Sequence, residues 1–245
     1  MRKILIAAGV GAVAIAGAFF YLLDNLDSLV KTAIEEAGSR VAGVKVSVAD
    51  VKIAIKEGRG TIKGLTVANP KGFTSPTAIS LGEVAVALDT GSITRNPVVI
   101  TDVLVAAPQV TYELAAGGSN IDAIRKNVQS FAGGGKSEPA AKDGASKKLV
   151  VDKLVVKDGK VSLATPLPGG KAGASLPDIQ LTNIGKASGG ATAAEVAGQL
   201  LDAISKTALK SVAGLGIDSV VQGAKGAAGD AVKGGLDQFK GMLGK

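Results

Sequence analysis

The stretch LVVDKLVVKDGKVSLATP, from Leu149 to Pro166, alternates β-branched and polar residues on both sides of Asp158-Gly159. An Asp-Gly pair readily adopts the positive φ angles of a tight turn, so this stretch predicts a β-hairpin. The alternation leaves the hairpin with one apolar face. That face needs a cover, and the rest of the chain indicates what kinds of cover are available.

Two earlier segments resemble this one. DVKIAIKEGRGTIKG begins at Asp50, DVLVAAPQVTYEL begins at Asp102, and DKLVVKDGKVSLA begins at Asp152. Each has an Asp, a run of alternating β-branched residues, a turn and a return strand, and the starts are 52 and 50 residues apart. The spacing indicates a repeated unit, while the alternative is a plain antiparallel meander, which also looks self-similar.

From Val44 onward the chain follows the two-residue period of strands. Gly, Pro and Asn separate the β-type runs, which are VKVSV, VKIAI, TIKGLTV, AISLG, VAVAL, VVITDVLV and QVTYEL. A Gly/Ala/Lys/Ser stretch at about residues 132–148 has little to bury and predicts a flexible surface linker. LPDIQLTNI, from Leu176 to Ile184, predicts a further strand.

The N-terminus predicts a membrane anchor. The segment Ile4 to Leu23 carries no charge, and its twenty residues would form a helix about 30 Å long, which matches the hydrocarbon core of a bilayer. Arg2 and Lys3 precede the segment, whereas Asp24 and Asp27 follow it. This asymmetry predicts that Met1 lies in the cytoplasm and that the body of the protein lies outside the membrane.

A cleaved signal peptide is the alternative for the same segment. AGA at Ala16–Ala18 has the small residues of a cleavage site, but the apolar run continues to Leu23, beyond the usual length of such a signal. This length favours an uncleaved anchor over residues 1–23. Both interpretations export the rest of the chain.

Helical periodicity occurs on both sides of the β-rich region. In residues 24–43 apolar residues recur at helical spacing and Gly38 can end the helix, so a short amphipathic helix is expected. In residues 191–245 a dense apolar stripe predicts a stable helix up to about Gly214. The glycine-rich remainder, Ile217 to Lys245, is expected to become helical only against a surface.

Composition excludes several kinds of chemistry. The chain has no Cys and no His, which removes disulfides, thiol nucleophiles, imidazole bases and nearly all zinc or haem ligation. Aromatic residues make up 3% and Trp is absent, so nucleic-acid stacking is not expected. A net charge of +7 suits an anionic partner such as phospholipid headgroups, although the cations are spread thinly.

No enzyme is predicted. Asp50, Asp102 and Asp152 suit strand entries better than acid–base work, since Asp bonds nearby backbone N–H groups in turns. Glu35-Glu36 are expected on the solvated face of the first helix. GGGK at Gly133–Lys136 lacks the spacing of a phosphate loop. We therefore expect no catalytic residue, no cofactor and no metal.

Several stretches in order resemble the AsmA-like family of envelope proteins in Gram-negative bacteria. They are LTVANPKGF (Leu65–Phe73), SPTAISLGEVAVALD (Ser75–Asp89), VVITDVLVAAPQVTYE (Val98–Glu113), SNIDAI (Ser119–Ile124) and LVVDKLVVKDGKVSL (Leu149–Leu163). SNIDAI is similar to the Asn-led helix start of that family. The resemblance covers roughly Leu26 to Ile184, with the anchor in the expected place.

The resemblance implies an inner-membrane anchor and a periplasmic body whose strands form a long, groove-like sheet. Larger relatives are associated with phospholipid movement towards the outer membrane or with outer-membrane assembly. This chain is shorter, and one β-body cannot cross an envelope alone. The helical tail after Gly190 also lies outside the resemblance.

The expected fold is α+β, with a transmembrane helix, an antiparallel groove-like sheet, flanking amphipathic helices and a helical Ala/Gly-rich tail. The expected domains are residues 1–23 (anchor), 24–43 (helix), 44–190 (β-rich periplasmic domain) and 191–245 (tail). A lipid chain or the chain's own helices would cover the apolar face. The candidate lipid-facing residues are Val51, Ile53, Ile55, Val84, Val86, Leu88, Val103, Val105, Val155 and Leu163.

The expected function is non-enzymatic and concerns envelope lipid homeostasis or outer-membrane biogenesis, with membrane phospholipid as partner. The alternative is an adaptor that holds an envelope protein at the inner membrane through the helical tail. An envelope enzyme is a third and weaker interpretation. Nucleic acid is not an expected partner.

Overall fold

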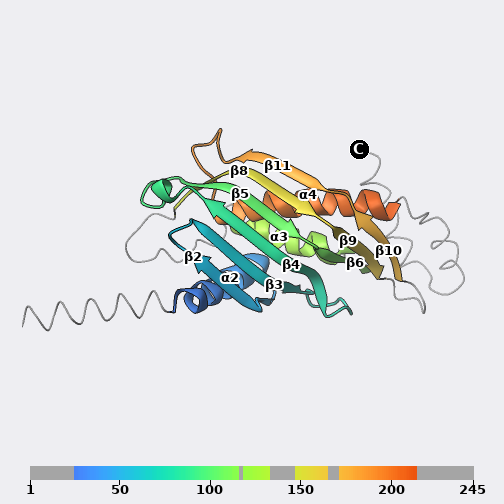
Figure 1. Cartoon of the computed structure of the whole chain (residues 1–245). Coiled ribbons are helices and arrows are strands. Elements are labelled where there is room, and N and C mark those ends of the chain that lie inside the picture. Colours follow the sequence, from blue (N-terminus) through green and yellow to red (C-terminus); the bar gives the residue numbers. More distant parts are fainter. Residues whose placement is uncertain (1–24, 116–117, 133–146, 165–170, 214–245) are drawn as a thin grey trace, which may run out of the picture.

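A computed structural model describes residues 25–115, 118–132, 147–164 and 171–213 of the chain (Figure 1). Over these residues the fold is α+β, with three α-helices packed on one side of a mixed sheet. The helices are α2 (Leu26–Ala42), α3 (Asn120–Ala132) and α4 (Ala193–Ala213), and η1 (Thr90–Ser92) is a short 3-10 turn. The strands are β1 (Val46–Ser47), β2 (Asp50–Ala54), β3 (Arg59–Ala68), β4 (Thr77–Leu88), β5 (Val98–Ala106), β6 (Gln109–Ala115), β7 (Gly118–Ser119), β8 (Leu149–Lys157), β9 (Gly159–Ala164), β10 (Lys171–Leu176) and β11 (Ile179–Ile184).

Most of these strands are halves of longer ones. Ala106 of β5 pairs with Glu83 of β4, and Gln109 of β6 pairs with Ser80 of β4. The register against β4 is therefore unchanged from β5 to β6. The same continuity joins β1 to β2, β8 to β9 and β10 to β11. Apart from the short β7, the sheet therefore consists of six long strands in the order β1/β2, β3, β4, β5/β6, β8/β9 and β10/β11.

One neighbouring pair in this sheet is parallel. β5/β6 runs parallel to β8/β9, and α3 lies in the connection between them. All other neighbours are antiparallel. The prediction of an antiparallel sheet was thus wrong for this pair. A parallel neighbour needs a crossover connection, and the segment with the SNIDAI helix supplies it.

The prediction of a hairpin at Asp158-Gly159 was also wrong, because β8 and β9 do not pair with each other. Asp158 does have the positive φ that was expected, at 56°, but the chain continues straight on. The neighbouring strand runs past the same point and bonds to both sides of it. The Ala107 amide donates to the Lys157 carbonyl at 2.9 Å, and the Lys160 amide donates to the Pro108 carbonyl at 2.8 Å.

The apparent repeats have a different origin from a repeated hairpin. The segments that begin at Asp102 and Asp152 are adjacent parallel strands, in which Asp102 lies opposite Lys153. Equal pairing positions in the sheet impose similar patterns of apolar residues. The segment at Asp50 is instead a true hairpin, since β2 pairs with β3.

A line of irregular positions crosses all six long strands, and we call it the crease. Three of its residues have positive φ: Gly64 at 60°, Ala107 at 49° and Asp158 at 56°. A Cβ added to Gly64 would lie 2.8 Å from the Ala49 Cβ, and one added to Gly82 would lie 3.4 Å from the Ala107 Cβ, so these positions are direct neighbours. In strand order the crease consists of Ala49, Gly64, Gly82, Ala107, Asp158 and Pro177.

The crease shifts the alternation of side chains, as a β-bulge does. Val105 and Val110 lie five positions apart, so a regular strand would place them on opposite faces. Both are fully buried and belong to one core cluster. Val156 and Val161 show the same change of phase in β8/β9. One residue of each strand at the crease departs from the alternation, so the apolar side chains on both sides of the crease point to a single face, here called the inner face, along the whole sheet.

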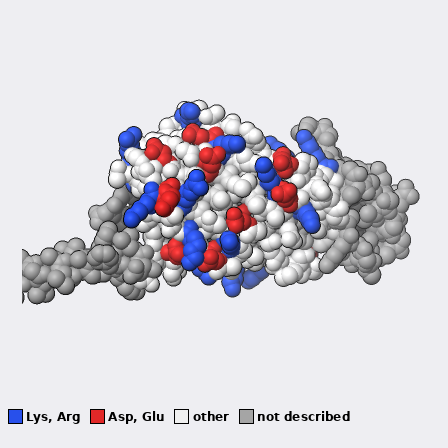
Figure 2. Space-filling view, viewed as in Figure 1, with Lys and Arg blue, Asp and Glu red and all other residues white. Residues whose placement is uncertain are grey.

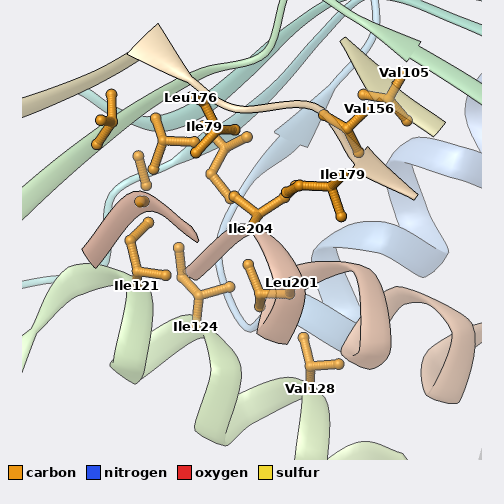
Figure 3. Packing of buried hydrophobic residues seen from close by; sticks show 14 of the residues in the cluster. Ile79, Val105, Ile121, Ile124, Val128, Val156, Leu176, Ile179, Leu201 and Ile204 are labelled. Atoms are coloured by element: carbon orange, nitrogen blue, oxygen red, sulfur yellow. The ribbon is translucent and has the colours of Figure 1, made fainter. Parts of the chain in front are cut away.

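The core lies between the inner face and two helices (Figure 3). Val105, Val156 and Ile179 point from the sheet towards Ile204 of α4. Helix α3 lies on the side of the core that faces away from these strand residues. Full burial of one such side chain contributes about 1.5–3 kcal/mol relative to exposure. The helical contribution comes from Ile121, Ile124, Val128, Leu201 and Ile204.

The helices predicted in residues 24–43 and 191–214 are confirmed as α2 and α4. α2 continues through Gly38, however, and ends at Gly43, which has the left-handed φ of 68°. Gly38 serves close packing instead, because an added Cβ would lie 3.2 Å from Val46. α4 begins with a capping box, in which the Glu195 amide donates to the Thr192 hydroxyl and the Thr192 amide donates to the Glu195 carboxylate.

Helix α2 covers the edge of the sheet at β1/β2. Its side chains accept hydrogen bonds from backbone N–H groups of this edge: Val46 donates to Ser39 at 2.9 Å, and Val48 donates to Glu35 at 2.8 Å. Ile53 donates to Asp27 at 2.8 Å. Glu35 is therefore a cap for the edge strand rather than only a solvated group. Such capping stops an open edge from pairing with another chain.

Several predictions fall outside the described residues: the anchor over residues 1–23, most of the linker at 132–148, and the conditional helix from Ile217 to Lys245. Among the residues that the structure describes, none of the helices combines the length and apolar character needed to cross a bilayer.

Candidate functional site

The candidate lipid-facing residues occupy three kinds of environment. Val51, Val105 and Leu163 are at most 4% exposed and belong to the interior. Ile55 is 47% exposed in the β2–β3 turn, and Val155 lies on the outer face, in the row that contains Leu104. The others are half-buried on the inner face, and we call them the open strip: Ile53, Val84, Val86, Leu88 and Val103.

The open strip exists because the helices leave the middle of the inner face uncovered. α2 packs against β1 and β2, α3 against β6 and β7, and α4 against β9, β10 and β11. Within the described residues no helix makes more than marginal contact with β3, β4 or β5. The strip therefore remains an apolar surface at the border of the core, with Val84 and Val103 packed against the core itself.

The outer face of the same strands is charged. Lys63 and Glu83 form a cross-strand ion pair at 3.8 Å, and Asp102 lies beside Lys153. Figure 2 shows cations and anions side by side across this face. Such a face suits solvent. The contrast makes the open strip the distinctive surface of the central strands, because its side chains are all branched aliphatic residues.

The acidic residues that were considered for catalysis are not brought together. Asp50 lies in β2, Asp102 in β5 and Asp152 in β8, with β3 and β4 between the first two. In the described parts of the chain no group of three or more His, Cys, Asp or Glu residues is placed to hold a metal ion. Burial raises the pKa of Tyr112 to about 12, so this phenol stays protonated at neutral pH.

Glu113 is the centre of a polar network that was not predicted. It is 6% exposed, and its carboxylate accepts hydrogen bonds from the Thr74 amide at 2.6 Å, the Thr74 hydroxyl at 2.7 Å and the Ser75 amide at 2.9 Å. The Asn69 amide group donates a fourth at 3.1 Å. Burial alone raises the pKa of Glu113, but the hydrogen bonds from Thr74 and Ser75 outweigh it and hold the pKa at about 2.

Asn120, at the start of α3, extends this network. Its side-chain oxygen accepts from the Glu113 amide at 2.9 Å, and its side-chain nitrogen donates to Asn69 at 2.8 Å and to the Thr111 carbonyl at 2.7 Å. The network thus ties the β3–β4 loop to β6 and α3. Its members come from the stretches LTVANPKGF, VTYE and SNIDAI and from Thr74-Ser75, so the available signal in the sequence was the polar residues at these positions.

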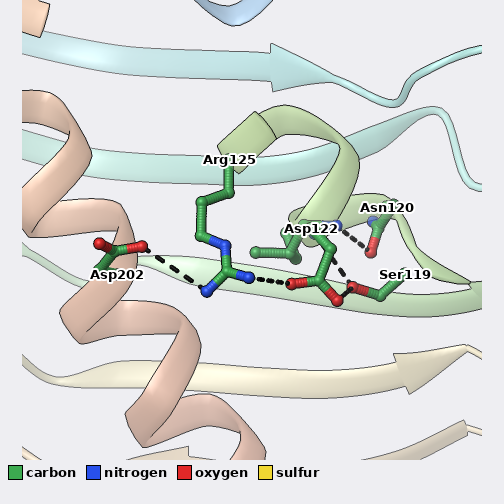
Figure 4. Close-up of polar contacts among 6 residues, drawn as sticks. Ser119, Asn120, Asp122, Arg125 and Asp202 are labelled. Carbon is green, nitrogen blue, oxygen red and sulfur yellow. Dashed lines mark hydrogen bonds and ion pairs between the residues drawn. The ribbon is translucent and has the colours of Figure 1, made fainter. Parts of the chain in front are cut away.

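A second set of contacts joins α3 to α4 (Figure 4). Ser119 and Asp122 bond reciprocally at the start of α3, which confirms the predicted helix start at SNIDAI. Arg125 then pairs with Asp122 at 3.2 Å and reaches Asp202 of α4 at 3.8 Å, a distance too long for a hydrogen bond. Both polar sets hold loops and helices in place, and neither lies on the open strip.

Comparison with family models and with curated proteins finds no match for this chain. The resemblance to AsmA-like proteins therefore stays a prediction from sequence.

Proposed function

We propose that the chain is a non-enzymatic, membrane-anchored envelope protein of AsmA-like type that holds acyl chains of phospholipid along the open strip. The observation that carries this proposal is the half-buried aliphatic surface on β4 and β5, with which no described helix makes more than marginal contact, together with Ile53 of β2. An apolar surface of this kind on an otherwise charged sheet marks a binding site for an apolar ligand.

The energetics suit a protein that holds lipid temporarily. Each methylene removed from water contributes about 0.8 kcal/mol, so an acyl chain is strongly retained against water. A lipid that passes from a bilayer to the strip exchanges one apolar environment for another. This exchange is nearly balanced, and lipid can therefore return to a membrane. Such reversibility supports a role in envelope lipid homeostasis or outer-membrane biogenesis.

The adaptor alternative depends on the tail from Ile217 to Lys245, which lies outside the described residues. Among the described residues, no contact favours the adaptor role over lipid binding.

Val86→Asp is expected to lower the lipid content of the purified full-length protein several-fold. Val86 is in the middle of the open strip, and a carboxylate there disfavours contact with an acyl chain. Because Val86 is only half-buried, the new charge can reach water, and most of the folded stability should remain. Organic extraction followed by mass spectrometry measures the bound lipid.

Ala85→Asp is the matched control. Ala85 is the preceding residue of β4, and it lies on the outer face between Thr61 and Leu104. This variant should retain lipid at the level of the unmodified chain. Equal lipid content in the two variants, or none in the unmodified protein, would contradict the proposal.

A further inference from the structure

One end of the sheet gathers several connections, and we call it the rim. It consists of residues 55–59, 89–97, 147–148 and 185–190. Leu88 donates to the Gly58 carbonyl at 2.9 Å and Val98 donates to the Lys148 carbonyl at 2.9 Å, which places the first three segments together. Leu149 pairs with Ala191, so the fourth segment joins them. α2 begins at this end as well, because Asp27 accepts from Ile53.

Exposed apolar side chains collect at this end. Four large hydrophobic residues in the described structure are strongly exposed, and three of them are here: Leu29 at 46%, Ile55 at 47% and Ile93 at 38%. Ile55 is in the β2–β3 turn, and Ile93 follows η1 in the β4–β5 connection. The fourth is Leu104, on the outer face. Aliphatic residues at the tips of turns cannot pack against their own sheet.

The rim is also the basic part of the described structure. It holds six exposed cations, namely Lys56, Arg59, Arg95, Lys147, Lys148 and Lys186, and two exposed acids, Glu57 and Asp89. The remaining described residues carry fourteen cations and thirteen acids. Almost the whole charge excess of the folded part therefore lies at one end, beside the exposed aliphatic residues. Asp27 does not offset it, since this carboxylate pairs with Lys52 at 3.2 Å.

We propose that the rim docks on the surface of an anionic phospholipid bilayer. Ile55 and Ile93 enter the headgroup region, and the surrounding lysines and arginines contact lipid phosphates. The combination of exposed aliphatic tips with cations fits a bilayer better than a nucleic acid or an acidic protein. Only Asp24 and Asn25 separate the charge-free segment Ile4–Leu23 from α2, so the same end faces the membrane that this segment suits.

Docking rests on the proposed function in one respect: the docked bilayer would be the source of the phospholipid that the open strip is proposed to hold. The open strip extends to this end, where Leu88 adjoins the Gly58 turn. A docked rim would place that end of the strip against the headgroups. Docking itself does not require the strip to bind lipid, so the two can be tested separately.

The absence of native cysteine allows site-specific labels in the full chain. Ile55→Cys and Ile93→Cys, each carrying an environment-sensitive fluorophore, are reconstituted in vesicles of phosphatidylcholine and phosphatidylglycerol that contain a headgroup-region quencher lipid. Both labels should be quenched several-fold more than labels at Lys71→Cys, at the opposite end of the sheet, and Leu104→Cys, on the outer face.

Charge reversal tests the electrostatic part. Lys56→Glu combined with Arg95→Glu should reduce quenching at position 93 several-fold in the anionic vesicles. High salt should have the same effect on the unmodified chain, because it screens these exposed charges. Both changes should matter less in vesicles of phosphatidylcholine alone.

Three outcomes would overturn docking: no quenching at positions 55 and 93, equal quenching at all four positions, or shielding of both labels in detergent without any quencher lipid. The last would indicate contact between copies of the chain. Val86→Asp should leave rim quenching intact while it lowers lipid content. Intact quenching with no bound lipid in the unmodified protein would therefore refute lipid binding by the strip but not docking.

Discussion

Glu113→Ala should destabilise the folded chain by about 3 kcal/mol, because removal of one partner from a buried charged network leaves the other polar groups without bonds. The affected donors are the amides of Thr74 and Ser75, the Thr74 hydroxyl and the Asn69 side chain. The β3–β4 loop would lose its attachment to β6. Thermal unfolding of the full chain in detergent, followed by circular dichroism, measures the change.

The same group makes stability depend on pH in a defined direction. The pKa of Glu113 is lowered from 4.5 to about 2 on folding, so the folded state favours the charged carboxylate. Its contribution is complete above pH 4.5 and is lost as the pH falls towards 2. A shift of this size corresponds to about 3 kcal/mol.

Glu113→Gln is the control for this prediction. The amide keeps one acceptor oxygen but cannot ionise. The free energy of unfolding of the Glu113→Gln protein should therefore change less than that of the unmodified chain between pH 5 and pH 3. Parallel loss of stability in both proteins over that range would show that other carboxylates cause the acid sensitivity. No loss of stability in Glu113→Ala at neutral pH would show that water replaces the carboxylate.

The strands of this fold could be predicted from sequence, but their connection at Asp158 could not. The two-residue period locates β8 and β9 correctly, and the positive φ at Asp158 was also expected. A positive φ in a strand can reverse the chain or insert one extra residue, and local sequence does not distinguish these results. The neighbouring strand decides between them, because Ala107 and Pro108 bond to both sides of Asp158.

The candidate site was partly predictable for a related reason. Alternation places Val84, Val86 and Val103 on one face, as the sequence indicates. Which of these residues a helix covers depends on where α3 and α4 pack, and that is set by long-range contacts. Val155 shows the limit of the pattern: the apolar residues of β8 stand next to one another, as Val155 and Val156 do, so alternation does not identify its inner face.

Glu113 could not be identified as a network centre from its own surroundings in sequence. Its partners Thr74 and Asn120 lie 39 and 7 residues away, and the loop that carries Thr74 has no regular period. A single buried carboxylate in a strand becomes meaningful only when its donors are known.

Gly64→Ala should destabilise the chain by about 2–5 kcal/mol, through two separable effects. Gly64 has a φ of 60°, a left-handed conformation that costs a residue with a Cβ about 1–2 kcal/mol. The new Cβ would also lie 2.8 Å from the Ala49 Cβ of the neighbouring strand, so the two strands must move apart at the crease. Overpacking of this kind costs about 1–3 kcal/mol.

Two further variants separate these effects. Gly72 also has a positive φ, 95°, but nothing lies within 4 Å of an added Cβ, so Gly72→Ala should show the conformational cost alone. Ala49→Gly combined with Gly64→Ala removes the clash and should recover about 1–2 kcal/mol relative to Gly64→Ala, which a double-mutant cycle measures. Additive effects of the two substitutions would mean that β1/β2 and β3 are not in contact at the crease.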